Sequence, residues 1–211
     1  MKSTTQLREE VLSGMEPYFS GLGFKRKKND QAWRKRQHAE TWRVVHCNFG
    51  LYEKDRRISL IPTLEVRHES IEQLKVAAGI LAQPSSDTAS FGIPLTRFRD
   101  GRPYWASIDD GPEKIVAALV PDLSRHSASV FQNLEDLDWV LKNLSGEDSK
   151  EWCVPSASHR VRLLPLIWHL KGDDQKAVDE LRRLKDELRL RDQMIPRMRQ
   201  FEEWFVGFVK G

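Results

Sequence analysis

A cluster of basic residues in the first fifth of the chain is the part of the sequence best suited to chemistry. Seven of the twelve residues from 25 to 36 are Lys or Arg, with aromatic rings within or just after this stretch. Cations neutralise phosphates, and the bases of single-stranded nucleic acid stack on aromatic rings. The same pattern is typical of a hairpin at a sheet edge whose charges are solvated or contact another protein. The residues predicted to contact a partner are Lys25, Lys27, Trp33, Arg34, Arg36 and Trp42.

The histidines and carboxylates show no spacing typical of a metal site. No two of the six histidines are four residues apart or form an HxH pair, so the sequence predicts no bound metal or cofactor. Glu65, Arg67 and His68 could form an acid–base group near the end of a strand. However, strand alternation places Glu65 and Arg67 on one face and His68 on the other, which argues against such a group.

Motifs for phosphate binding and nucleophilic catalysis are missing from the sequence. It contains no GxGxxG, GxxxxGK[ST] or GxSxG pattern, and Cys47 and Cys153 have no CxxC spacing. We expect both cysteines to be buried free thiols, which favours a reducing cytoplasm. We also expect no enzymatic activity. An enzyme with an unfamiliar site remains a further alternative, and it would hold several titratable residues in a concave pocket.

The elements that must position these residues follow from hydrophobic periodicity. Apolar residues recur every three or four positions in helices and at every second position in half-buried strands. Pro62 interrupts one of the strands and predicts an edge position or a bulge there. The predicted elements up to residue 108 are a helix over 4–22, a hairpin over 24–36, strands over 41–51, 57–68, 89–93 and 104–108, and a helix over 70–81.

From Gly111 onward the periodicity is helical, with a polar stretch at 145–155 that is typical of a linker. Three further helices are predicted over about 156–171, 173–190 and 194–209. The sequence therefore predicts an α+β fold, in which an N-terminal helix and a twisted antiparallel sheet with packed helices are followed by a C-terminal helical layer. We expect residues 1–144 to form one domain and 156–211 to form a helical subdomain packed on it.

Charge and hydropathy exclude some classes of function. The formal net charge of the 211 residues is +3, with a balance of +5 over residues 1–50 and of zero over 172–211. No run approaches the roughly 20 apolar residues that a membrane helix needs. Acidic residues near the N-terminus stand where a signal peptide would be apolar. These features predict a cytoplasmic protein with no membrane partner.

Three segments together resemble a known family. They are LGFKRKKNDQAWRKR, PTLEVRHESIEQL and LPLIWHLKGDDQKAVDELRRL, at residues 22–36, 62–74 and 164–184. They resemble a broad bacterial family, number forty-three-oh-four in the domain-of-unknown-function series, mainly over residues 5–140. That family offers no established catalytic residues. Its members are often encoded near polymorphic toxin systems, so the resemblance implies an immunity or accessory role.

Two functions from different classes remain open on the sequence. The leading hypothesis is a non-enzymatic protein-binding module, an immunity-like protein that neutralises a co-produced bacterial toxin. The segment with the strongest charge bias is basic. The partner would therefore be acidic where it meets this segment, or contact would be made elsewhere, for example by 145–211. The alternative is a nucleic-acid-binding accessory protein that uses the ribbon at 24–43. The partner's identity and the oligomeric state stay open.

Overall fold

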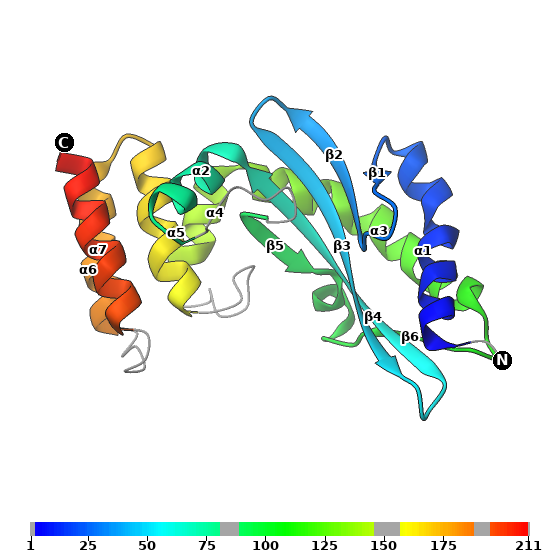
Figure 1. The fold of residues 1–211 in the computed structure, drawn as a ribbon. Coiled ribbons are helices and arrows are strands. Elements are labelled where there is room, and N and C mark those ends of the chain that lie inside the picture. Colours follow the sequence, from blue (N-terminus) through cyan, green and yellow to red (C-terminus); the bar gives the residue numbers. More distant parts are fainter. Residues whose placement is uncertain (1–2, 81–88, 146–156, 188–194, 211) are drawn as a thin grey trace. The chain divides into compact units, whose positions relative to one another are not determined.

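The computed structural model describes residues 3–80, 89–145, 157–187 and 195–210. They form an α+β fold, as the sequence predicts, and they divide into two compact units (Figure 1). The first unit comprises Met1–Val66 and Gly92–Leu134, and the second comprises Arg67–Phe91 and Glu135–Gly211.

A six-stranded antiparallel sheet organises the first unit. Five strands follow the order β1-β2-β3-β4-β5, and β6 pairs with β4 beside this path. Paired positions include Arg26 with Trp33, Trp33 with Val45, and Ser59 with Trp105. The strands are β1 (Lys25–Arg26), β2 (Ala32–His38), β3 (Thr41–Tyr52), β4 (Arg57–His68), β5 (Phe91–Pro94) and β6 (Tyr104–Ser107).

Pro62 does not lie on an edge strand, so that part of the prediction is wrong. Strand β4 has β3 on one side and both β5 and β6 on the other. The segment Arg57–Leu60 pairs with β6 and ends just before Pro62. Because proline has no backbone N–H to donate, it is best tolerated where the pairing of a strand is interrupted.

Helix α1 (Thr4–Gly21) begins with a capping box. The Ser3 hydroxyl accepts from the backbone N–H of Gln6, and the Gln6 side chain accepts from the Ser3 N–H. The helix continues through Pro17, and Gly23 follows its end at a φ of +79°, a conformation that favours glycine. The buried stripe of α1 is Leu7, Val11, Leu12, Met15 and Phe19.

The core of the first unit lies between one face of the sheet and two adjacent helices, α1 and α3 (Pro112–Glu135). A Cβ on Gly14 of α1 would lie 3.2 Å from Val116 of α3, so these helices pack closely. Between them and the sheet lie fully buried side chains of three strands, Trp33, Ile58, Leu60 and Tyr104. A short 3-10 helix, Leu95–Arg99, connects β5 to β6.

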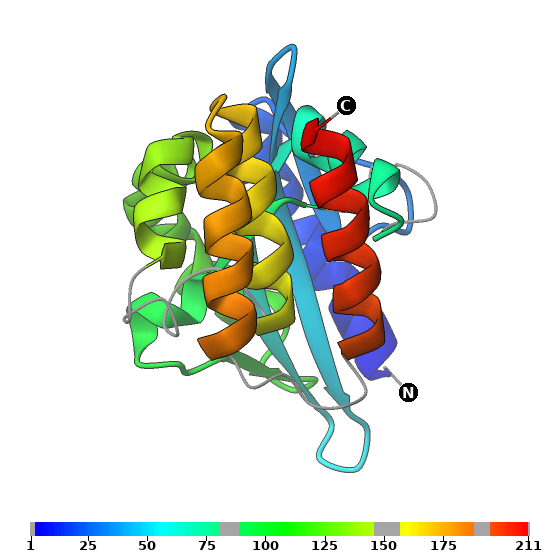
Figure 2. The same ribbon diagram turned by 90° about the vertical axis from the view of Figure 1, so that its left-hand side faces the viewer.

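The second unit is helical. It contains α2 (Glu69–Ala77), α4 (Leu137–Ser145), α5 (Ala157–Leu170), α6 (Asp174–Glu187) and α7 (Ile195–Lys210). Helices α5 and α6 form an antiparallel pair (Figure 2), joined by a tight turn in which Gly172 has a φ of +79°. Buried Leu164 and Ile167 of α5, Leu181 of α6 and Phe205 of α7 supply apolar core.

This division differs from the predicted domain boundary. The sequence places 1–144 in one domain, whereas α2 and α4 group with the C-terminal helices in the structure. The physical reason is packing, because both α2 and α4 contact α5. Most of the predicted linker, residues 146–155, lies outside the described residues.

Candidate functional site

The basic hairpin predicted at 24–36 forms in the structure. Lys25 pairs with Arg34 and Arg26 with Trp33, and the five residues 27–31 connect the two strands. Asn29 adopts a φ of +67°, and the N–H of Asp30 donates to the carbonyl of Lys27 at 3.1 Å. Arg26 Nη1 closes this loop by donating to the Asp30 carbonyl at 3.0 Å.

Trp33 belongs to the core, which corrects its prediction as a partner-contacting residue. Its side chain is fully buried, and its ring lies 4.5 Å from that of Phe19 on α1. The indole Nε1 donates to Glu16 Oε2 at 3.0 Å, and Arg26 lies over the ring at 5.5 Å. A ring enclosed in this way cannot stack on a base or contact a partner.

Several of the seven cations are held within the protein. Arg34 Nη1 lies 2.5 Å from Asp30 Oδ2, and Lys35 Nζ donates to the carbonyl of Leu22 at 3.0 Å. Partial burial raises the pKa of Asp30, but the hydrogen bond and the charge of Arg34 outweigh it, and the pKa lies below its usual value. Arg26 contacts Glu16 at 3.4 Å. The positive charge of the hairpin is therefore smaller at its surface than the sequence suggests.

Four of the remaining predicted residues, Lys25, Arg34, Arg36 and Trp42, share the face of the hairpin that points away from α1. Directly paired residues lie on the same face of a sheet, which joins Lys25 with Arg34 and Arg36 with Trp42. Lys25 and Arg36 are exposed, and Trp42 is half-buried. The Arg36 guanidinium lies 5.6 Å from the centre of the Trp42 ring and donates to the Ala39 carbonyl at 2.9 Å.

We call this surface the ribbon face. It comprises Lys25, Arg34, Arg36 and Trp42 together with the exposed loop cation Lys27. Five of the six predicted contact residues thus lie on or beside one surface, and Trp33 lies on the opposite side of the strand. The size of its side chain could have distinguished Trp33 from the other predicted contact residues. A large apolar ring on an otherwise basic strand marks the buried face.

A polar cluster that the sequence did not predict lies on the same face of the sheet. Glu65 Oε1 of β4 is 3.9 Å from His46 Nδ1 of β3. Burial raises the pKa of Glu65 to about 7, against the opposing charge of Arg34. A Cβ on Gly92 would lie 2.9 Å from Glu65 Cγ, so the neighbouring strand approaches the carboxyl side chain closely. The cluster forms because the register of β3 and β4 brings its residues together. The spacing of these residues in the sequence does not reveal that register.

Arg67 and His68 of the predicted acid–base group have other partners. Arg67 forms a two-pronged pair with Glu69, in which both nitrogen–oxygen distances are 2.9 Å. The His68 ring lies edge-on to Phe91 at 5.7 Å. Both side chains are buried in the second unit.

A network of buried charges surrounds Glu72 in the second unit. The Glu72 carboxylate is fully buried and lies 2.6 Å from Lys75 Nζ. It accepts from Ser90 Oγ at 2.8 Å and lies 3.8 Å from Arg67 Nη1. Burial lowers the pKa of Lys75, and the charge of Glu72 opposes this shift. Each charge has a partner at short range, as a buried ionic cluster requires.

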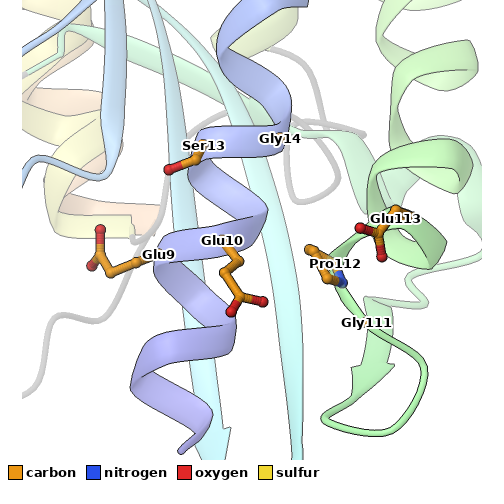
Figure 3. A pocket seen from close by; sticks show the side chains of 7 residues that line it. All are labelled: Glu9, Glu10, Ser13, Gly14, Gly111, Pro112 and Glu113. Carbon is orange, nitrogen blue, oxygen red and sulfur yellow. The ribbon is translucent and has the colours of Figure 1, made fainter. Parts of the chain in front are cut away.

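An open groove of about 590 Å³ lies between α1 and the start of α3 (Figure 3). Three carboxylates, those of Glu9, Glu10 and Glu113, line it together with small residues. Glu9 accepts from Arg8 Nη2 at 2.7 Å. Acidic side chains on an open surface are ordinarily solvated, and nothing else at the groove indicates a ligand.

The described residues include no grouping of metal ligands and no membrane-spanning helix. Among them, no three His, Cys, Asp or Glu side chains are grouped so that they could hold a metal ion. No helix in the described ranges has the length and apolar character to cross a membrane. Cys47 is a buried free thiol, as predicted, and burial raises its pKa. Cys153 lies outside the described residues.

Comparison with known proteins adds no further assignment. The chain matches no protein-family model, no curated protein and no solved structure. The resemblance of its sequence to the bacterial family of unknown function therefore stays a prediction.

Proposed function

We propose that this chain is a non-enzymatic protein-binding module, and that it acts as an immunity-like protein by neutralising a co-produced bacterial toxin. The observation that carries the proposal is the ribbon face, where exposed Lys25 and Arg36 lie with the half-buried Trp42 on one surface. Arginine and tryptophan are enriched at the centres of protein interfaces. Neutralising a toxin requires an interface and no active site.

The partner surface would be acidic where it meets the ribbon face. Exposed Lys25, Lys27, Lys28 and Arg36 are cations, and the nearest carboxylate of the loop, Asp30, already pairs with Arg34. Opposite charges across an interface accelerate association and discriminate against wrong partners. The free buried thiol of Cys47 suits the cytoplasmic location that is part of this proposal.

Burial of Trp33 favours a protein partner over the nucleic-acid alternative. Binding of single strands needs rings on which successive bases stack. Trp33 lies in the core, and Arg36 lies over the ring of Trp42. The ribbon face therefore offers fewer stacking positions than the sequence suggests, while the exposed cations remain.

Co-expression with the product of the neighbouring gene tests the proposal. We expect restored growth of cells that express a toxic neighbour and a complex measurable by calorimetry. The substitutions Lys25→Glu and Arg36→Glu together should weaken the complex at least tenfold. The matched control is Arg199→Glu with Lys210→Glu, which reverses two exposed cations on α7 and should leave binding unchanged.

Absence of both binding and growth rescue would contradict the toxin-neutralising role. Equal loss of affinity in the two double variants would remove the ribbon face from the interface. The nucleic-acid alternative is tested with a fluorescent single-stranded oligonucleotide over a series of salt concentrations. Binding that weakens steeply with salt, and that the ribbon substitutions abolish, would favour that alternative.

A further inference from the structure

An exposed pair of aromatic rings lies on the sheet beside the β3–β4 turn. Tyr52 of β3 and Trp105 of β6 have ring centres 5.2 Å apart, although β4 runs between their strands. The Arg57 guanidinium of β4 lies 4.9 Å from the centre of the Trp105 ring. Tyr52 is 42% exposed and Trp105 is 41% exposed. We call Tyr52, Arg57 and Trp105 the aromatic platform.

Small residues beneath the rings position the platform. Ser59 is the direct strand partner of Trp105 and is buried. A Cβ on Gly50 would lie 2.6 Å from Ser59 Oγ and 3.0 Å from Cε2 of Tyr52. Gly50 therefore leaves the space that the Tyr52 ring occupies. The rings have defined positions on the sheet and still leave apolar surface exposed to water.

The platform has the composition of an interface centre. Tryptophan, tyrosine and arginine are the residue types most enriched among the side chains that dominate binding energy. Burying the exposed surface of two large rings in an interface is favourable, because it removes apolar surface from water. The turn beside the platform projects beyond the other elements of the first unit in both views (Figures 1 and 2), so a second molecule can reach it.

The charges around the platform are balanced. Arg57 lies 3.4 Å from Asp55, and Arg56 lies 3.2 Å from Asp109. The side chains of Arg57 and Asp55 are 51% and 55% exposed, so both remain available to another molecule. A strongly acidic or strongly basic partner would gain little binding energy from a surface whose charges are balanced in this way. An identical copy gains more, because a twofold axis brings each patch against itself and can place every cation beside an anion.

We propose that the aromatic platform binds the same platform of a second copy of this chain, forming a twofold-symmetric dimer. The rings of both copies form its apolar centre, and Arg57 of one copy pairs with Asp55 of the other. This interface uses residues outside the ribbon face and does not depend on the toxin-binding role. Its small area predicts a weak dimer, with a dissociation constant in the micromolar range or above.

Analytical ultracentrifugation of the full chain over a wide concentration range tests the dimer. We expect the weight-average mass to rise from monomer towards dimer as concentration increases. Trp105→Ser should weaken the dimer at least tenfold, and unchanged far-ultraviolet circular dichroism shows that the variant folds. Lys25→Glu with Arg36→Glu should leave the dimer unchanged. A wild-type chain that stays monomeric, or a dimer that survives Trp105→Ser, would overturn the proposal.

Charge reversal tests the twofold pairing directly. Arg57→Asp alone places two carboxylates together across the axis, and Asp55→Arg alone places two guanidinium groups together, so each variant should be monomeric. A mixture of the two variants should form a heterodimer, because both contacts then join opposite charges. Failure of the mixture to associate, while each variant alone is folded and monomeric, would refute the proposed pairing.

Discussion

The indole Nε1 of Trp33 donates a hydrogen bond of 3.0 Å to Oε2 of Glu16, a contact that joins strand β2 to helix α1. The same carboxylate lies 3.4 Å from Arg26 Nε, so Glu16 also contacts β1. Together with the ring contact between Phe19 and Trp33, these bonds hold the hairpin on the helix. The ribbon face consequently lies on a hairpin that is held against α1.

Removing the indole donor should destabilise the first unit modestly. Trp33→Phe keeps an aromatic ring in the core but deletes the N–H that Glu16 accepts, and we expect a loss of about 1–3 kcal/mol from the free energy of unfolding. Trp33→Ala should cost about 3–5 kcal/mol, because it also leaves a cavity. Urea denaturation measures both values. The control Arg36→Ala changes an exposed side chain of the same strand and should lie within about 0.5 kcal/mol of wild type.

The pKa of Glu65, raised to about 7 by burial, makes the stability of the fold depend on pH. A raised folded pKa means that the folded protein holds the proton more tightly than the unfolded chain. The resulting stabilisation is complete below pH 4.5, which is the ordinary pKa of a glutamate side chain. It is lost as the pH rises to about 7. The shift corresponds to about 3 kcal/mol.

Glu65→Gln should therefore stabilise the protein at pH 8 by up to about 3 kcal/mol and have little effect near pH 4.5. Urea denaturation at several pH values, with wild type and variant compared at each pH, measures the difference. Glu203→Gln makes the same chemical change at an exposed position of α7 and serves as the control. A difference between wild type and Glu65→Gln that does not grow between pH 5 and pH 7 would contradict the assignment.

The elements were predictable because their periodicity is local. Alternation over 41–51 and 57–68 predicted β3 and β4 to within one residue, and the helical spacing of 4–22 predicted α1 equally well. One apolar face in a strand or one apolar stripe in a helix can be recognised without knowledge of distant residues. The fold class follows from the order of such elements.

The candidate sites were less predictable because they depend on contacts distant in sequence. Trp33 and Arg34 are neighbours in a basic strand, and Trp33 is buried because α1 packs against its side of the strand. Glu65 and His46 meet through the register of β3 and β4. The grouping of α4 with the C-terminal helices likewise follows from its contact with α5. The composition of the predicted linker gives no indication of this contact.

The buried charges around Glu72 should be strongly coupled. Lys75→Met removes the closest cation, leaves the fully buried carboxylate with less compensation, and should cost about 3–5 kcal/mol. Adding Glu72→Gln removes the buried negative charge as well, so the double variant should lose less than the sum of the two single losses. A double-mutant cycle in urea measures this coupling. Strict additivity of the two substitutions would show that the 2.6 Å contact contributes no net interaction.

Two glycines should respond in opposite directions to the same substitution. At Gly92 in β5, a Cβ would lie 2.9 Å from Glu65 Cγ and 3.1 Å from Thr63 Cγ2, so Gly92→Ala must displace side chains on β4 and should cost about 1–3 kcal/mol. At Gly207 in α7, a Cβ would meet no atom within 4 Å. Gly207→Ala should stabilise the protein by about 0.5–1 kcal/mol, because alanine favours the helix. Thermal and urea denaturation measure the change in stability of each variant, and so the sign of each change. A stabilised Gly92→Ala variant would mean that β5 can move away from Glu65, and the polar cluster on that face would then be less closely packed than the structure indicates.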